Sequence, residues 1–71
     1  MIPSTVVGSK GARFILESVS IKRDEESGNY ALDAKYISVI RRQEVRAIAH
    51  GALDDVLDNL EKQVKQIGEL L

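Results

Sequence analysis

In the last third of the chain, hydrophobic residues recur with alternating spacings of four and three positions. This is the a/d pattern of a heptad repeat, in which one stripe of a helix is apolar. Polar and charged residues fill the intervening positions, which solvates the remaining faces. A strand alternates its side chains with a period of two and could not gather such a stripe. The apolar positions, called the seam below, are Leu53, Leu57, Leu60, Val64, Ile67 and Leu71.

Two β-rich segments precede this pattern, at residues 12–22 and 30–40. They enclose a polar run that closes on Gly28 and Asn29, and two such segments around a polar loop predict an antiparallel hairpin. Residues 1–11 contain a proline and two glycines, and we expect them to form an arm or a short edge strand.

A register for the hairpin follows from matching side chains across its two strands. Setting Ile21 opposite Leu32 pairs apolar with apolar side chains, as cross-strand neighbours favour. Continued along the strands, the same register gives the pairs Val19–Ala34, Glu17–Tyr36, Leu16–Ile37 and Phe14–Val39. A slip of one residue would exchange the two faces. This register leaves a second apolar patch near the open end, to be covered by the N-terminal arm or a second chain.

We interpret residues 41–71 as one long helix. Its first part carries a stripe of small apolar residues beside the seam, namely Val45, Ile48, Ala49, Ala52 and Val56. Gly51 costs about 1 kcal/mol relative to alanine inside a helix, which a long helix tolerates. A break near His50 and Gly51 is the alternative. The predicted fold is a single α+β domain over residues 1–71, with the hairpin packed on the long C-terminal helix.

The small size of the chain favours assembly. A chain of 71 residues buries only about 60% of the surface that its unfolded form exposes, so one core gives little net stability. The sequence has no cysteine and one histidine, so a disulfide or a common zinc site cannot supplement the core. The seam would extend beyond a hairpin of this length. We therefore expect a homodimer or a higher oligomer with the seam as its interface.

Charge is nearly balanced overall but uneven along the chain. The net charge is −1, too small to steer the molecule as a whole toward nucleic acid or a membrane. Residues 1–46 hold eight basic and six acidic side chains, and residues 47–71 hold two and five, giving +2 and −3. This asymmetry could favour head-to-tail contacts, although an ordinary solvated surface is the simpler interpretation.

Candidate catalytic chemistry is sparse. His50 and Asp54 are one helical turn apart in the predicted helix, but no hydroxyl or thiol nucleophile shares that face. A metal would need further ligands, and an interface histidine is the preferred interpretation. We expect no enzyme activity, no metal and no cofactor.

The most informative charged group is Arg41, Arg42 and Arg46 at the predicted helix start, where arginine opposes the helix dipole. Together with Lys10 and Arg13 these arginines could contact phosphate groups. The chain has only three aromatic residues for base stacking, which weakens an assignment to nucleic-acid binding.

The sequence therefore favours a small non-enzymatic interaction protein, such as an adaptor, inhibitor or regulatory subunit. It would self-associate through its C-terminal helix and bind another macromolecule, in the first place a protein. The alternative is an oligomer that binds nucleic acid or a phosphorylated ligand through the arginine cluster. No segment has the length of a membrane span, and residues 1–7 lack the character of a signal peptide. We expect no membrane partner and a cytoplasmic location.

Overall fold

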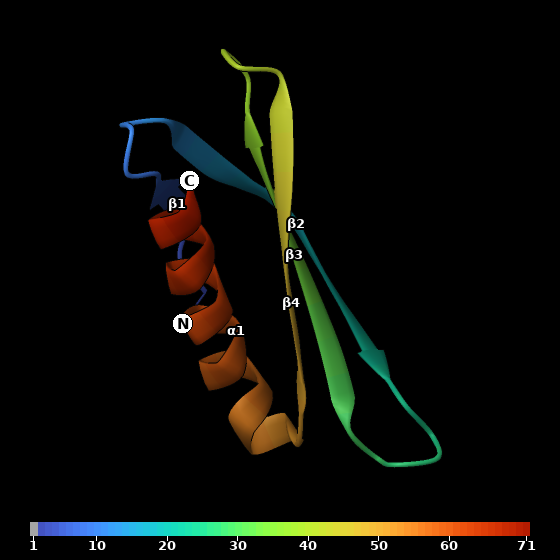
Figure 1. Ribbon diagram of the computed structural model, residues 1–71. Helices are drawn as coiled ribbons and strands as arrows, with labels where there is room; N and C mark the ends of the chain where they lie inside the picture. The colour runs from blue at the N-terminus through green and yellow to red at the C-terminus, as the bar shows by residue number, and fades with distance from the viewer. Residues whose placement is uncertain (1) are drawn as a thin grey trace.

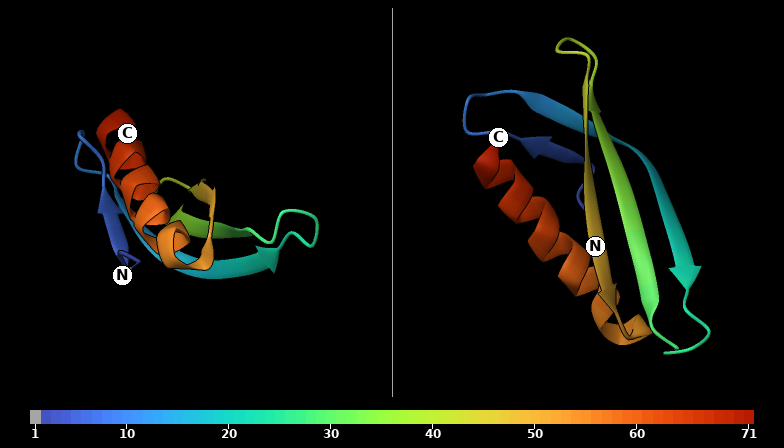
Figure 2. Two further views of the ribbon diagram at one scale, coloured as in Figure 1. Left: turned by 90° about the horizontal axis from the view of Figure 1, so that it is seen from below. Right: turned by 45° about the vertical axis from the view of Figure 1, so that its right-hand side comes forward.

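The computed structural model of the chain describes residues 2–71, and over this range it consists of an antiparallel sheet and one helix. The elements in order are β1 (Thr5–Val7), β2 (Arg13–Arg23), β3 (Tyr30–Ser38), β4 (Gln43–Gly51) and α1 (Leu53–Leu70). The strands lie in the sheet in the same order as in the chain, each antiparallel to the next. The sheet curls around α1, which runs back from the end of β4 toward β1 (Figures 1 and 2).

The predicted α+β class and the predicted hairpin are confirmed. β2 and β3 correspond to the two β-rich segments, and β1 is the short edge strand expected within the first eleven residues. Met1, which belongs to that predicted arm, lies outside the described residues. A turn follows β1, in which the Gly11 amide donates to the Gly8 carbonyl over 2.9 Å.

The predicted helix over residues 41–71 is wrong in its first third, because residues 43–51 form β4. Val45, Ala47 and Ala49 face the helix side of the sheet, while the residues between them face the opposite side. This is a period of two. Alanine favours helices and is depleted in strands, so the composition of this segment predicts a helix where the structure has a strand. Small side chains are needed here because α1 packs closely on β4.

The chain changes from strand to helix at Gly51. The φ angle of Gly51 is 154°, a backbone conformation that side-chain-bearing residues rarely adopt. The side-chain amide of Asn59 donates to the carbonyl of His50 over 3.0 Å and so ties the end of β4 to the second turn of α1. Asp54 and Asp55 lie in the first helical turn, where the helix dipole favours negative charge. The alternative of a helix that breaks near His50 and Gly51 is therefore correct only in the position of the break, because a strand precedes Gly51.

The predicted hairpin register is confirmed in the half nearest the β2–β3 loop and wrong in the other half. Ile21 lies opposite Leu32 as predicted, but the register shifts between Leu16 and Ser18. Glu17 is the extra residue of a β-bulge, which lets two residues of one strand oppose one of its neighbour. Beyond the bulge the pairs differ from the prediction. Leu16 opposes Tyr36 instead of Ile37, which is opposite Ile15, and Glu17 has no cross-strand partner in β3. Phe14 pairs with Val6 of β1 instead of Val39.

The bulge places the large side chains of β2 in the core. Phe14 and Tyr36 are buried, and so are Val56 and Leu60 of α1. The hydroxyl of Tyr36 donates to the carbonyl of Pro3 over 2.7 Å, so the segment before β1 is fixed to the centre of the sheet. The second apolar patch of the predicted hairpin is thereby largely absorbed, since Phe14 and Leu16 turn toward the helix.

The seam divides into two parts. Leu60 and Val64 are buried against the sheet, and Ile67 and Leu71 pack against the same core. Leu53 and Leu57 remain 56% and 45% exposed. The expectation that the seam overhangs the hairpin is wrong, because the helix begins at Leu53 and folds back along the sheet. The homodimer or higher oligomer stays a prediction, and an overhanging seam no longer supports it.

Candidate functional site

The loop between β3 and β4, residues 39–42, is the most exposed apolar feature of the described chain, and we call it the hairpin tip. Its residues are Val39, Ile40, Arg41 and Arg42. Ile40 is 96% exposed and Val39 is 75% exposed. Figure 1 shows that the tip projects beyond the helix and beyond the turn between β1 and β2.

The hairpin tip is a tight turn with one hydrogen bond back to the end of β3. The amide of Arg41 donates to the side-chain oxygen of Ser38 over 3.4 Å, and Ser38 is itself buried. Arg42 has a φ angle of 55°, which completes the reversal of the chain in the left-handed region. Two aliphatic and two guanidinium side chains are thus presented from a tight connection between two strands.

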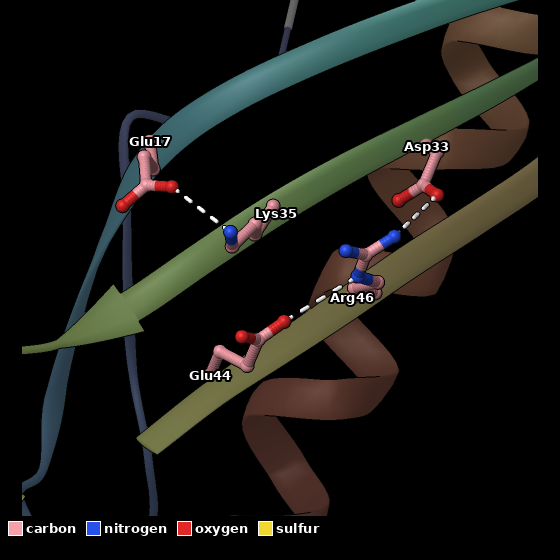
Figure 3. Close-up of polar contacts among 5 residues, drawn as sticks. All are labelled: Glu17, Asp33, Lys35, Glu44 and Arg46. Carbon is pink, nitrogen blue, oxygen red and sulfur yellow. Dashed lines mark hydrogen bonds and ion pairs between the residues drawn. The ribbon is translucent and has the colours of Figure 1, made fainter. Parts of the chain in front are cut away.

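The side chain of Arg46, on the edge strand β4, forms two ion pairs, as Figure 3 shows. Its guanidinium lies 3.2 Å from the carboxylate of Asp33 and 3.4 Å from that of Glu44. Beside it, the ammonium of Lys35 lies 3.1 Å from the carboxylate of Glu17, the bulge residue. These ion pairs neutralise the outer face of the sheet, so Arg46 is not placed to act with the other arginines.

The remaining basic residues predicted to contact phosphate lie at one end of the molecule. Arg41 and Arg42 are together in the hairpin tip, exposed and without an ion pair inside residues 2–71. Lys10 lies in the β1–β2 turn and Arg13 begins β2, on another element at the same end (Figure 1). The premise that this cluster opens a helix is wrong, since residues 41 and 42 belong to a turn and residue 46 to β4.

Aromatic side chains do not contribute to a stacking surface. Phe14 and Tyr36 are buried in the core, and Tyr30 is half-buried. Burial raises the pKa of Tyr36 above its ordinary value of 10.0, which keeps the phenol protonated as the donor to Pro3. These three residues are all the aromatic residues of the chain, so sequence-tolerant base stacking has no platform here.

Two further groups of exposed apolar residues, one on β2 and one on α1, lie on the helix side of the sheet away from the hairpin tip, and we call them together the open patch. Its residues are Val19, Ile21, Leu53 and Leu57, each at least two-fifths exposed. Sequence reasoning assigned Leu53 and Leu57 to an interface, but missed the two β2 residues because a complete cover by the helix was assumed.

The one pair considered for a metal or a catalytic base is not brought together as predicted. His50 is an exposed residue of β4, while Asp54 belongs to α1. No group of three or more potential metal ligands gathers among the described residues. An open groove of about 760 Å³ is lined by residues of β1 and α1, which include Thr5, Val7, Lys65 and Glu69.

Within residues 2–71, no helix combines the length and apolar character that crossing a bilayer requires. Comparisons of the chain with protein-family models, curated proteins and solved structures find no match.

Proposed function

We propose that this chain is a non-enzymatic interaction protein that binds another protein through the hairpin tip. The observation that carries the proposal is the near-complete exposure of Ile40 at the end of a projecting hairpin. An isolated exposed aliphatic residue is ordinary, but Ile40 follows the exposed Val39 and precedes two exposed arginines.

The energetics of such a tip suit docking on a protein surface. Burying an aliphatic side chain of this size contributes about 1.5–3 kcal/mol before the costs of association. Arginine is enriched among residues that dominate binding energy, where its guanidinium pairs with carboxylates of the partner. The connection between β3 and β4 is short, so less conformational entropy is lost than on ordering a flexible loop.

Binding of nucleic acid or a phosphorylated ligand is the second candidate, favoured by the exposed guanidinium groups of Arg41 and Arg42. Three observations reduce its support. Arg46 is paired with Asp33 and Glu44, the aromatic side chains are turned inward, and the net charge is −1. Ile40 has no role in phosphate binding, whereas it is the natural anchor for an apolar pocket on a protein.

The test is photo-crosslinking from position 40 in the host cell, combined with capture from host extract by the purified chain. The capture is repeated with Ile40→Ser and with Leu70→Ser. Leu70 is 87% exposed and lies on α1, so Leu70→Ser is a matched control for loss of an exposed aliphatic side chain. We expect one protein to crosslink at position 40, and its capture to be lost with Ile40→Ser and retained with Leu70→Ser.

Titrations with oligonucleotides and nucleotides test the second candidate, binding of nucleic acid or a phosphorylated ligand. Phosphate binding would make affinity fall steeply with salt, and replacing Arg41 and Arg42 with alanine would make that slope shallower by about one unit for each arginine that binds a phosphate. Such a salt slope, together with capture that is indifferent to Ile40→Ser, would overturn the proposal in favour of phosphate binding.

A further inference from the structure

The two ends of the molecule carry opposite charge. Six exposed acidic side chains gather at the end farthest from the hairpin tip, in the β2–β3 loop and the first turns of α1; they are Asp24, Glu25, Glu26, Asp54, Asp55 and Asp58. Lys22 and Arg23 are the basic residues beside them, so this acidic end carries a charge of −4, from six minus two. The hairpin tip carries +2 from Arg41 and Arg42. Figure 1 shows the tip and the acidic end at opposite ends of the sheet.

The open patch lies at the acidic end. Val19 and Ile21 oppose Ala34 and Leu32, so all four side chains are on the helix side of the sheet. Ala34 and Leu32 are buried there, whereas the two residues of β2 are exposed because α1 lies along β4 and does not cover the end of β2 (Figure 2).

The helix contributes the other border of the open patch. Leu53 and Leu57 precede Leu60 and Val64 by seven residues, which places each pair on the same side of the helix. Leu60 and Val64 contact the sheet, but Leu53 and Leu57 stay about half exposed. Asp54 and Asp58 follow directly on the same helical turns, so carboxylates border the apolar surface.

We propose that the open patch of one copy accepts the hairpin tip of a second copy of this chain. Ile40 packs between the β2 and α1 borders of the patch, and Arg41 and Arg42 pair with the carboxylates of Asp54 and Asp58. The inference rests on the proposed function in one respect, namely that the tip is the binding element. It adds the acceptor surface and identifies the occupant as another copy.

Complementarity on two counts supports a second copy as the occupant. The tip and the patch are both apolar at their centres, and the basic tip is complementary to the acidic α1 border of the patch, whereas the β2 border ends at Arg23. An acidic border on one side favours one orientation of the tip over others. The donor and acceptor surfaces are far apart on a molecule whose longest dimension is 40 Å. A copy therefore cannot satisfy its own patch with its own tip, and each bound copy leaves one tip and one patch free. Such a head-to-tail contact builds an open chain of copies instead of a closed symmetric dimer.

Complementation between two defective variants tests this arrangement. Ile40→Asp removes the tip and Leu57→Asp removes the patch, and each change should raise the dissociation constant at least about tenfold. In analytical ultracentrifugation at about 50 mM salt, the average mass of the unmutated chain should rise with protein concentration. At about 500 mM salt, where charge pairs are screened, the average mass at the same protein concentration should be lower. Each variant alone should remain a monomer. An equimolar mixture should form dimers and nothing larger, because it holds one intact tip and one intact patch per pair.

A charge-reversed pair repeats the test without changing any apolar residue, in case Leu57→Asp disturbs the helix. Arg41→Glu with Arg42→Glu reverses the tip, and Asp54→Lys with Asp58→Lys reverses the borders of the patch. Each reversed variant should be monomeric, and their mixture should assemble as far as the unmutated chain does. Circular dichroism of each variant confirms that the fold is kept.

The outcomes separate this inference from the proposed function. A mixture that stays monomeric while the unmutated chain self-associates would show a different, symmetric contact and overturn the inference. An unmutated chain that is monomeric up to about 1 mM at low salt would also overturn it. If capture of a host protein nevertheless depends on Ile40 and not on Leu57, the proposed function stands alone. If capture depends on neither residue and the chain does not self-associate, both fall.

Discussion

At the scale of single residues, Tyr36 ties the segment before β1 to the interior of the sheet. It lies in the central strand β3, its ring is buried, and its hydroxyl reaches the carbonyl of Pro3 in front of the edge strand. A three-residue edge strand has little ladder of its own. The hydrogen bond from Tyr36 therefore fixes the entry of the chain to the core at a point where backbone pairing is short.

Tyr36→Phe should lower the free energy of unfolding by about 0.5–1.5 kcal/mol, the usual net value of one intramolecular hydrogen bond. Burial raises the pKa of Tyr36, so the neutral phenol is favoured in the folded state. The stability that the neutral phenol contributes is complete below the ordinary pKa of 10.0. It is lost as the pH rises through the higher pKa that Tyr36 has in the folded protein. Urea unfolding at about pH 8 and about pH 11 should show the difference between the two proteins narrowing at the higher pH. A constant difference would mean that the phenol is solvated.

Gly51 decides where strand becomes helix. An added Cβ would lie 3.0 Å from the side-chain amide nitrogen of Asn59 at a φ of 154°, so Gly51→Ala should cost about 1–3 kcal/mol of stability. Gly11 is a matched control, since its φ is also positive but no atom lies within 4 Å of an added Cβ. Chemical denaturation of Gly51→Ala and Gly11→Ala should show the larger loss at position 51. Equal losses would mean that the contact with Asn59 adds nothing to the loss of stability at position 51.

At the scale of elements, the bulge at Glu17 determines which side of β2 is buried. Without it the loop-end register would continue, and Ile15 would take the place of Phe14 on the helix side. The half of β2 near the β2–β3 loop is mainly polar, and the other half is apolar and contacts β1 and the core. The bulge lets each half place its apolar side chains on the helix side.

Deleting Glu17 removes the extra residue together with the bulge, so the remaining residues of β2 keep the cross-strand pairs that they have now. Glu17→Ala loses only a partly exposed ion pair with Lys35 and should change stability by about 1 kcal/mol or less. The deletion leaves Leu16 next to Ser18, which keeps Phe14 and Leu16 on the helix side, so it should cost no more than about 2 kcal/mol, from the lost bend of the strand. Thermal unfolding followed by circular dichroism measures both. A deletion that costs about 3 kcal/mol or more would show that β2 needs the bend of the bulge to meet both β1 and α1.

The elements were predictable where one pattern dominated and not where two competed. The alternation around Ile21 and Leu32 gave the correct hairpin, and the 3.6-residue period after Leu53 gave the correct helix. In β4 the alternating Val45, Ala47 and Ala49 are small because α1 lies on them, and their helix propensity masks the period of two. A bulge leaves no comparable mark, since Glu17 suits a polar strand position equally well. The exposure of Ile40 could not be predicted either, because it depends on residues 39–42 being a turn.

At the scale of the whole molecule, the two ends of the helix lie in different environments. Its C-terminal part completes the core, with Leu60 and Val64 buried and the end of the helix close to Gly8. Its N-terminal part leaves Leu53 and Leu57 exposed beside the acidic residues. The regular heptad pattern of the seam thus spans two environments, and a sequence pattern alone cannot separate an intramolecular contact from an intermolecular one.

The final prediction separates these two environments with one substitution in each. Leu60→Ala removes a side chain that is fully buried and should lower the free energy of unfolding by about 2–5 kcal/mol. Leu57→Ala should lower it by about 1 kcal/mol or less, because the side chain is half in water already. On the same samples, analytical ultracentrifugation should show that Leu57→Ala weakens association of copies at concentrations where the chain remains folded. If both variants instead dissociate an assembly with little loss of stability, the whole seam is an interface between copies. If both cost the same stability, Leu57 is part of the core in solution, and the open patch does not exist.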